Sequence, residues 1–423
     1  MNNKIDQKRP LPGSWLVAGS ASVIFGFGRG IHTSFGVFYV ALLDNFGWSR
    51  GTTAGVYSMN LIVDAILSPI VGHLLDRYGP KRIVGIGCLI LASGLLLSSQ
   101  INSLWQFYIF FGLVSAVGLS FMGMVPHVVL VSEWFSSKRA FALGVVYSAT
   151  GVGIMLLVPT IQWSISRVGW AWVFQALAAL VLLILMPLVL GFYRHGPHFG
   201  GMPRDPTKAQ KQWTARLALR SLQFWLLFFG RVVASSGTMV IVTHQVAHVV
   251  DIGYSRIFAA TLFGLMGITS TFGRLIFGYI ADLFSKRTAY MLNILTAVVG
   301  IGGLMAARDP SQPWLLYVYL LFFGVAFGSR AVILSALAAD IFSGKGFGSI
   351  FGFAAISVGV GGALGSWLGG VLYDGTGSYL MSFEYAISVL AVSVLAIWMA
   401  SSGWVKSYDE RLWPSSATQP TNH

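Results

Sequence analysis

The sequence is a succession of apolar runs, each long enough to cross a membrane as a helix. A spanning helix needs about 20 mostly apolar residues, and the charged, proline-containing and asparagine-containing clusters of this chain separate twelve such runs. Ordinary soluble domains carry about 25% charged residues, whereas this chain carries 10%. The sequence therefore predicts an all-α integral membrane protein whose twelve transmembrane helices cover 14–43, 51–75, 83–101, 104–131, 140–166, 171–193, 222–250, 257–281, 289–307, 314–340, 348–373 and 380–403.

The predicted spans fall into two groups of six, separated by the longest break in the pattern. This break, residues 194–221, is rich in Lys and Arg, and we interpret it as a basic cytoplasmic linker. The predicted domains are an N-terminal six-helix half over 1–193, the linker, a C-terminal six-helix half over 222–403 and a cytoplasmic tail over 404–423. No other connection is long enough to hold a folded domain.

The two halves resemble each other in sequence. Trp48-Ser49-Arg50 is matched by Tyr254-Ser255-Arg256, and Gly72-x-x-x-Asp76-Arg77 by Gly278-x-x-x-Asp282, both displaced by 206 positions (254 − 48 and 278 − 72). Duplicated halves related by an axis along the membrane normal are typical of secondary transporters, which bind substrate near the midplane between the halves. The repeat predicts two pseudo-symmetric halves that move by alternating access.

The formal charge of +13 has a topological explanation. Cytoplasmic connections carry an excess of Lys and Arg, and most of the 27 such residues fall on one side if the N-terminus is inside. The opposite connections hold only Arg50, Arg167, Arg256 and Arg308. We therefore expect both termini at the cytoplasmic face of the cell inner membrane, with the lipid bilayer as surroundings and no nucleic-acid partner.

Four arginines remain inside predicted spans, namely Arg29, Arg231, Arg274 and Arg330, while Asp64 is the only acid deep in a span. A central Arg facing lipid costs at least about 2.5–3.5 kcal/mol, so these side chains are expected to face the interior of the bundle. The buried positive excess favours an organic anion as substrate over a cation or a neutral molecule.

One loop motif resembles a known superfamily. The segment Gly72-His73-Leu74-Leu75-Asp76-Arg77-Tyr78-Gly79-Pro80-Lys81-Arg82 is similar to the loop joining helices two and three of the major facilitator superfamily, and a degenerate copy spans 278–287. The resemblance implies the major facilitator fold. We interpret Gly72, Asp76, Arg77 and Asp282 as a conformational latch, since Gly permits close helix approach and charges can hold neighbouring helix ends together.

Within that superfamily, the chain resembles the monocarboxylate porters and the oxalate/formate antiporters. Three segments carry this resemblance: Ser34-Phe35-Gly36-Val37-Phe38-Tyr39 with Asp44-Asn45-Phe46-Gly47-Trp48-Ser49, Trp134-Phe135-x-x-Lys138-Arg139 running to Gly151-Val152-Gly153, and Arg274-x-x-x-Gly278-x-x-Ala281-Asp282. The resemblance implies that Arg274 binds the substrate carboxylate. Three positions depart from the family patterns, because Ser270 stands at an Asp position and Thr33 and Ala354 stand near Lys positions.

Arg274 is the first candidate for substrate binding, because a guanidinium can pair with a carboxylate through two hydrogen bonds. The alternative is a structural ion pair. Arg330 and Arg29 either contact a second anionic group or pair with Asp64, and Tyr147 is a candidate hydroxyl contact. Arg231 is expected to pair structurally or to reach the membrane surface.

Histidines and Asp64 are the candidates for proton coupling and gating. His32 takes the place of a substrate-contacting Gln in the antiporter pattern, and it can titrate near neutral pH; the alternative is a bond to a backbone carbonyl. Asp64 is a breakable salt-bridge member, a proton carrier or a static clamp. His244, which forms an i,i+4 pair with His248, is expected in an outer gate or proton relay, and no metal site is predicted. His127 is expected to be capped beside a Pro126 kink.

The leading hypothesis is a secondary active transporter of small organic monocarboxylates of the lactate or pyruvate type, working by proton symport. The runner-up is an exchanger of dicarboxylates or hydroxy acids, in the manner of oxalate/formate antiport, and a membrane sensor is a third possibility. No group of nucleophile, base and orienting residue indicates an enzyme, and no phosphate-binding loop indicates ATP drive. We expect no cofactor apart from a proton or an exchanged anion as coupling species, and a monomer.

Overall fold

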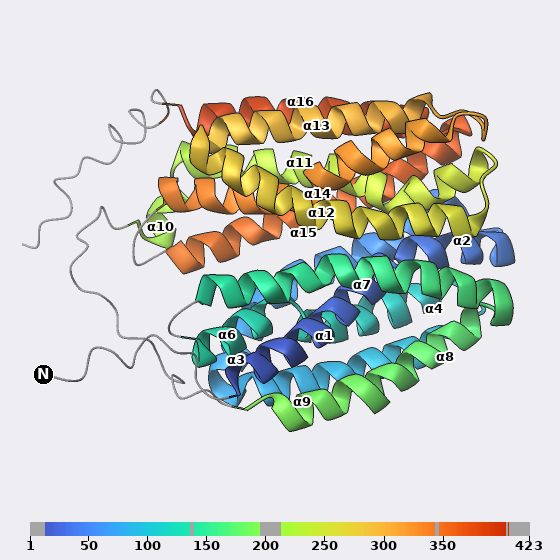
Figure 1. The fold of residues 1–423 in the computed structure, drawn as a ribbon, viewed down its shortest axis with the longest axis horizontal. Helices are drawn as coiled ribbons and strands as arrows, with labels where there is room; N and C mark the ends of the chain where they lie inside the picture. The colour runs from blue at the N-terminus through green and yellow to red at the C-terminus, as the bar shows by residue number, and fades with distance from the viewer. Residues whose placement is uncertain (1–12, 136–138, 195–212, 343–346, 403–404, 406–423) are drawn as a thin grey trace, which may run out of the picture.

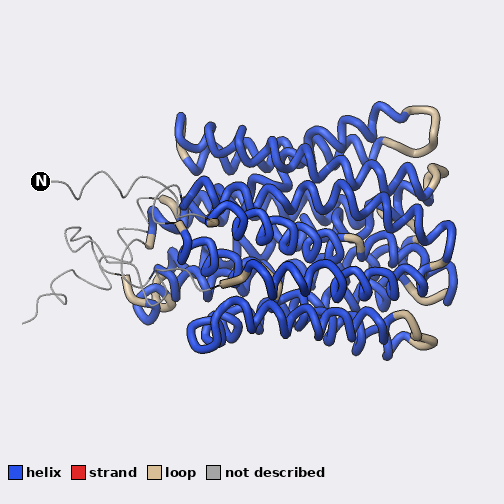
Figure 2. Tube along the Cα trace, turned by 60° about the horizontal axis from the view of Figure 1, so that its bottom comes forward, coloured by secondary structure: helices blue, strands red, loops and turns tan. Residues whose placement is uncertain are grey.

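The computed structural model describes residues 13–135, 139–194, 213–342, 347–402 and 405. Within these ranges every regular element is a helix and none is a strand (Figure 1). The helices run lengthwise through one bundle, and the connecting turns gather at its two ends (Figure 2). The predicted all-α architecture is therefore confirmed.

The first group of helices runs from α1 to α9. In chain order it contains α1 (Ser14–Thr33), α2 (Phe35–Phe46), α3 (Arg50–Ser98), α4 (Leu104–Phe107), the π-helical segment η2 (Tyr108–Ser115), α5 (Ala116–Phe121), α6 (Met124–Trp134), α7 (Arg139–Val168), α8 (Trp170–Leu180), the π-helical segment η3 (Val181–Leu185) and α9 (Met186–Phe192). This group occupies the lower part of the view in Figure 1, in blue to green.

The second group follows the short helix α10 (Ala215–Ala218), which lies inside the predicted linker. It contains α11 (Leu222–Asp251), α12 (Arg256–Leu283), α13 (Lys286–Ala306), α14 (Pro313–Ile341), α15 (Phe347–Thr376) and α16 (Leu380–Ala400). These helices fill the upper part of the view, in yellow-green to red. Most of the predicted linker, 195–212, and of the predicted tail, 406–423, lies outside the described residues.

Eleven segments of the described helices are long and apolar enough to cross a membrane. They correspond to the second to twelfth predicted spans, whereas the first predicted span is divided into α1 and α2. At the division, the hydroxyls of Thr33 and Ser34 donate to the carbonyls of Arg29 and Gly30, each at 2.7 Å. Such side-chain bonds compete with the helical ladder and favour a break.

The long helix α3 holds two predicted spans with a sharp bend between them. Gly79 has φ 74° and ψ 162°, a backbone conformation that suits glycine, and Pro80 follows it. The chain thereby turns back on itself at this point. We call the end of the bundle where α1 begins and α16 ends the terminal end, and the opposite end the far end; the bend at Gly79 lies at the terminal end.

The two groups meet chiefly along two pairs of helices, α3 against α15 and α7 against α12, and also where α2 packs against α11. The crossing of α7 and α12 is close because both helices have a glycine there. A Cβ on Gly151 would lie 2.3 Å from Thr271 Oγ1, and one on Gly267 would lie 2.3 Å from the Gly151 carbonyl oxygen. Any larger residue at either position would push the two groups apart beside the candidate site.

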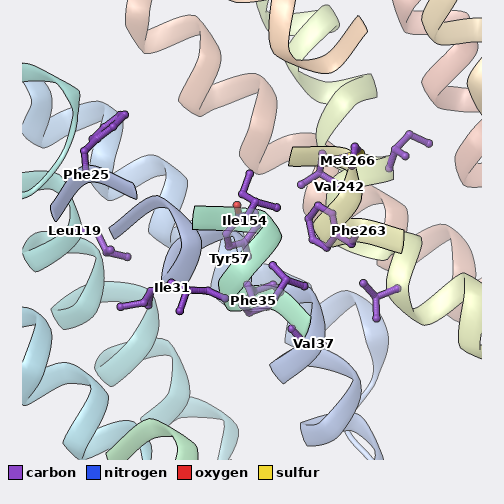
Figure 3. Packing of buried hydrophobic residues seen from close by; sticks show 14 of the residues in the cluster. Phe25, Ile31, Phe35, Val37, Tyr57, Leu119, Ile154, Val242, Phe263 and Met266 are labelled. Carbon is purple, nitrogen blue, oxygen red and sulfur yellow. The ribbon is translucent and has the colours of Figure 1, made fainter. Parts of the chain in front are cut away.

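Buried apolar side chains from both groups pack in one cluster at the middle of the bundle. Figure 3 shows Phe35 and Tyr57 of the first group near Val242 and Phe263 of the second. The outside of the bundle is also apolar: Leu183 is 75% exposed. Contiguous apolar surface of this kind marks a membrane interface, and the protein is a multi-pass integral membrane protein.

Candidate functional site

Arg274 lies on α12 and joins the two groups of helices. Its Nε donates to the carbonyl oxygen of Gly328 on α14, and its Nη1 donates to the carbonyl oxygen of Tyr147 on α7, both at 3.2 Å. Arg274 is seven residues beyond the close crossing at Gly267, and this crossing brings α7 within reach. Among the side chains that the structure describes, no acid pairs with Arg274. The structural ion pair considered above is therefore not seen.

Arg29 brings a second positive charge to Arg274 from the opposite group. The side chain lies on α1, is partly buried, and its guanidinium has no hydrogen bond or ion pair with any described side chain. Its charge acts on Arg274 and on the neighbouring His32 and Tyr57. Two like charges that act on each other without an acidic partner repel, and an anion bound near both would relieve that repulsion.

His32 is buried one turn beyond Arg29, at the end of α1. Its Nδ1 lies 3.2 Å from the Tyr57 hydroxyl, with which it shares a hydrogen bond, and the two rings are 4.9 Å apart. Its Nε2 and Oδ1 of Asn60 are both buried and lie near each other, and neither has another partner in the described residues. Buried polar atoms need hydrogen-bond partners, so these atoms are suited to bind a polar ligand group.

Asp64 is partly buried on α3 and accepts a hydrogen bond of 2.7 Å from the Ser120 hydroxyl. Asp64 follows Tyr57 by about two turns of the same helix, and Tyr57 bonds to His32 of the neighbouring α1. No ion pair joins Asp64 to Arg29 or Arg330 in the described part of the chain. In this conformation Asp64 is therefore held by a neutral hydroxyl.

Arg330 lies on α14 and points into the second group. Its Nε donates to Asn293 Oδ1 at 3.2 Å, and its Nη1 donates to the Thr238 hydroxyl. The residue is only 7% exposed, and its Nη2 is buried without a described partner. Arg330 is two residues from Gly328, the partner of Arg274, but its described partners are neutral side chains of α11 and α13.

Two other residues predicted from the sequence are Tyr147 and Arg231. Tyr147 contacts Arg274 through its backbone, and Arg231 forms a hydrogen bond elsewhere in the bundle. Tyr147 contributes its carbonyl oxygen to Arg274, while its ring packs 5.7 Å from that of Phe25. Arg231 is buried and donates from Nε to the Ser357 hydroxyl at 3.2 Å. Arg231 therefore bonds within the second group.

The other three histidines considered above, His127, His244 and His248, bond to backbone carbonyls. His244 and His248 donate from Nε2 to the carbonyl oxygens of Ser366 (2.8 Å) and Leu304 (3.2 Å). These separate partners leave the i,i+4 pair without a common ligand position. His127 bonds to the Gly123 carbonyl at 2.6 Å and to the Tyr193 hydroxyl at 2.8 Å, and the predicted capped histidine is confirmed.

The predicted latch is only partly covered by the structure. The side chains of Asp76 and Asp282 lie outside the described residues. Arg77 is exposed and lies over the Tyr78 ring at 5.2 Å. A Cβ on Gly72 would meet nothing closer than Val125 at 4.0 Å, so Gly72 is not at a close helix crossing in this conformation.

Two ion pairs at the far end were missed by the sequence reasoning. Arg50 pairs with Asp251 through both terminal nitrogens, at 2.6 and 2.8 Å, and Arg256 pairs with Asp44. By sequence, both arginines are expected in outer connections as exposed cations. The equivalent positions of Arg50 and Arg256 in the internal repeat suggest a shared role. The sequence does not indicate which acid each arginine pairs with.

The fold and the comparisons with known proteins together define a class of membrane transporters. The family model of the Major Facilitator Superfamily matches residues 18–335. The solved structure of the nucleoside transporter NupG superposes with a TM-score of 0.74 at 14% identity, covering 92% of this chain and 100% of that one. The chain belongs to the Major Facilitator Superfamily, and it is a transporter of a small molecule rather than an enzyme.

Within this superfamily, the chain is similar in sequence to proteins named as monocarboxylate transporters. The chain is 26% identical over 391 residues to Monocarboxylate transporter 11 of Homo sapiens, covering 89% of this chain and 80% of the relative. It is 27% identical over 383 residues to Monocarboxylate transporter 13 of Rattus norvegicus, covering 88% and 85%. The predicted resemblance to monocarboxylate porters is confirmed.

Proposed function

We propose that this protein is a secondary active transporter of small organic monocarboxylates that works by alternating access and proton symport. Relatives named as monocarboxylate transporters support the substrate class. The observation that carries the proposal is the position of Arg274, which reaches both groups of helices without an acidic partner among the described side chains.

The substrate carboxylate binds at Arg274, with Arg29 as a second source of positive charge. In the structure the Arg274 donors are directed at two backbone carbonyls. A carboxylate competes well with a neutral carbonyl because it brings a full opposite charge and accepts two parallel bonds from one guanidinium. Binding therefore releases the Tyr147 carbonyl, which belongs to the other group, and so couples substrate binding to the contact between the groups.

Charge neutralisation drives the transport cycle. The empty site resists closure because Arg29 and Arg274 repel each other, and a bound monocarboxylate lowers that cost. A proton on His32 or Asp64 makes the carried charge zero. Both residues lie in the region where the Arg29 charge acts, and neither forms an ion pair in the described structure.

The excess of Lys and Arg in connections at the terminal end supports an orientation with both termini in the cytoplasm. The protein works as a monomer in the cell inner membrane, with the proton as coupling species and no cofactor. Gly72, Asp76, Arg77 and Asp282 hold the terminal end as a latch, and His244 acts in a gate at the far end. His244 supports this role by its position, since its ring lies 5.5 Å from Tyr39 and 5.2 Å from Tyr379.

The test is a thermal-shift screen of small carboxylates on purified protein. Selective binding to the native state raises the unfolding midpoint. We expect lactate-type or pyruvate-type acids to stabilise the wild type. Arg274→Gln should weaken that binding about 10- to 140-fold, which corresponds to the loss of a charged hydrogen bond of about 1.5–3 kcal/mol. Arg308→Gln, a change at an exposed arginine of a far-end connection, is the matched control. Equal stabilisation of Arg274→Gln and wild type would overturn the site.

One observation favours a second candidate function, the exchange of dicarboxylates or hydroxy acids. Arg330 Nη2 is buried without a described partner, and Arg330 is two residues from the Gly328 contact of Arg274. A second carboxylate at Arg330 would pair this guanidinium. Arg330→Ala separates the two functions, because a monocarboxylate carrier retains lactate-type binding while a dicarboxylate carrier loses its preference for diacids. This preference among acids is measured by counter-flow of labelled acid in liposomes.

A further inference from the structure

The far end of the bundle is closed by a cluster centred on Arg50, the first residue of α3. Its guanidinium forms a two-bond pair with Asp251 at the end of α11, and its Nη1 also donates to the Tyr379 hydroxyl at 2.7 Å. The Arg50 guanidinium also stacks on the ring of Tyr373, and its Cζ lies 3.8 Å from the ring centre. Every one of these partners belongs to the second group, so Arg50 ties the two groups together.

The backbone at Arg50 is held across the same boundary. The backbone nitrogens of Arg50 and Gly51 donate to the two carboxylate oxygens of Asp374 on α15, at 2.9 and 2.7 Å. These are free amides in the first turn of α3, where a negative charge is favourable. The beginning of α3 is therefore capped by an acid from the other group.

A second ion pair crosses the boundary in the reverse sense. Arg256 begins α12 of the second group and pairs with Asp44 near the end of α2 in the first group. Each arginine follows a serine whose hydroxyl caps its helix, Ser49 in one case and Ser255 in the other. Arg50 and Arg256 are the equivalent residues of the internal repeat, 206 positions apart (256 − 50).

The acids complete the symmetry. Asp44 lies six residues before Arg50, and Asp251 lies five residues before Arg256. Each group thus ends its first span with an Asp and begins its second span with an Arg, and each Arg pairs with the Asp of the other group. This reciprocal arrangement is what a twofold relation between the groups produces at an interface.

No equivalent pair is seen at the terminal end in the described residues. The ion pair found there, Lys286 with Asp340, joins α13 and α14 within the second group. The described ion pairs between groups are therefore confined to the far end, where they add to the buried aromatic packing of Tyr39, His244 and Tyr379.

We propose that the Arg50–Asp251 and Arg256–Asp44 pairs form a twofold far-end lock, in which both pairs break together when the far end opens. The two pairs contribute unequally. The side chains of Arg50 and Asp251 are 19% and 30% exposed, against 47% and 49% for Arg256 and Asp44. Exposed pairs are weakened by solvent and salt, so the Arg50 pair is the stronger half of the lock. The lock rests on the proposed alternating access but not on any substrate.

The experiment measures the distance across the far end by pulsed electron–electron double resonance, on protein in lipid nanodiscs without substrate. Spin labels are placed on Asn102→Cys, in the turn before α4, and Ser311→Cys, in the turn before α14; both positions are exposed. The natural Cys88 is buried and is the only cysteine of the chain. We expect one dominant short distance in the parent protein.

Removing either half of the lock should populate a longer distance. We expect Asp251→Asn to raise the ratio of open to closed far end about tenfold, and Arg256→Gln about two- to fivefold, in keeping with the modest strength of exposed ion pairs. The exchange Asp44→Arg with Arg256→Asp restores the pair with reversed charges and should return the parent distribution. Lys286→Ala, which breaks an ion pair inside one group, is the matched control and should leave the distance unchanged.

Two results would overturn the lock: unchanged distances in both single variants, or failure of the charge exchange to restore a shifted distribution in folded protein. The thermal midpoint of each variant shows whether it is folded. If Asp251→Asn does not fold, Arg256→Gln and the charge exchange at Asp44 and Arg256 still test the lock. The proposed substrate can be wrong while these distances behave as expected, since no carboxylate is present in the measurement.

Discussion

Arg274 on α12 donates a hydrogen bond of 3.2 Å to the backbone carbonyl of Tyr147 on α7, so the side chain proposed to bind substrate also holds the two groups of helices together. The bond exists because Gly151 and Gly267 let the two helices cross closely nearby. A ligand that takes this donor away from Tyr147 changes the contact between the groups. Substrate binding and movement are thus linked through a single guanidinium.

The first prediction concerns Arg29, which acts on Arg274 with a like charge. Arg29→Gln should raise the thermal midpoint of the empty protein, because a repulsion is removed and no described partner is lost. The same change should weaken carboxylate binding about tenfold, which corresponds to about 1.4 kcal/mol. Thermal shift without and with substrate measures both effects. A lower midpoint together with unchanged affinity would mean that Arg29 serves only the structure.

The second prediction concerns the glycine crossing of α7 and α12. Gly267→Ala places a Cβ 2.3 Å from the Gly151 carbonyl oxygen, and overpacking of this kind costs about 1–3 kcal/mol. We expect a lower unfolding midpoint and reduced uptake. Gly278→Ala on the same helix is the control, since nothing lies within 4 Å of the added Cβ. Similar effects of both changes would contradict the close crossing.

The third prediction concerns the buried bond between His127 and Tyr193. Tyr193→Phe removes the hydroxyl that lies 2.8 Å from His127 Nε2. A buried acceptor left without a partner costs about 1–3 kcal/mol, so we expect a lower unfolding midpoint with transport affinity retained. Tyr279→Phe, at an exposed tyrosine of α12, should change neither quantity. A midpoint equal to that of the parent would show that the bond contributes nothing.

The fourth prediction concerns proton coupling. Asp64→Asn removes a titratable group while keeping an oxygen that can accept from Ser120, and His32→Gln removes the other candidate. If Asp64 carries the proton, uptake by Asp64→Asn should no longer respond to an imposed pH gradient, while exchange of labelled substrate continues. His32→Gln then keeps the response. Gradient-driven uptake that survives in the double variant would remove proton symport through these residues.

Much of the fold could be predicted because membrane insertion depends on local composition. Eleven predicted spans reappear as continuous apolar segments. The first was divided at Ser34, and this break depends on hydroxyl bonds to the preceding turn. Apolar content alone does not report such bonds, which explains the difference.

The contacts of the site residues were harder to predict. A buried charge requires a hydrogen-bond or ion-pair partner, but the sequence does not show which residue provides it. Asp64 was expected to compete for Arg29 or Arg330, yet it accepts from Ser120, 56 positions away. Arg330 was expected to face either substrate or Asp64, yet its described partners are Thr238 and Asn293. These partners lie on helices whose rotation about their own axes the apolar pattern does not specify.

The sequence by itself determined the membrane environment, the duplicated halves and the few charges inside the spans, since each of these follows from residue type and local order along the chain. Only the tertiary structure decided which residues meet. Arg274 reaches Tyr147 because two glycines allow α7 and α12 to touch, and Arg50 reaches Asp251, 201 positions away, because two separate groups of helices come together at the far end. Contacts between groups depend on how packed surfaces fit, and that information is spread over the whole chain.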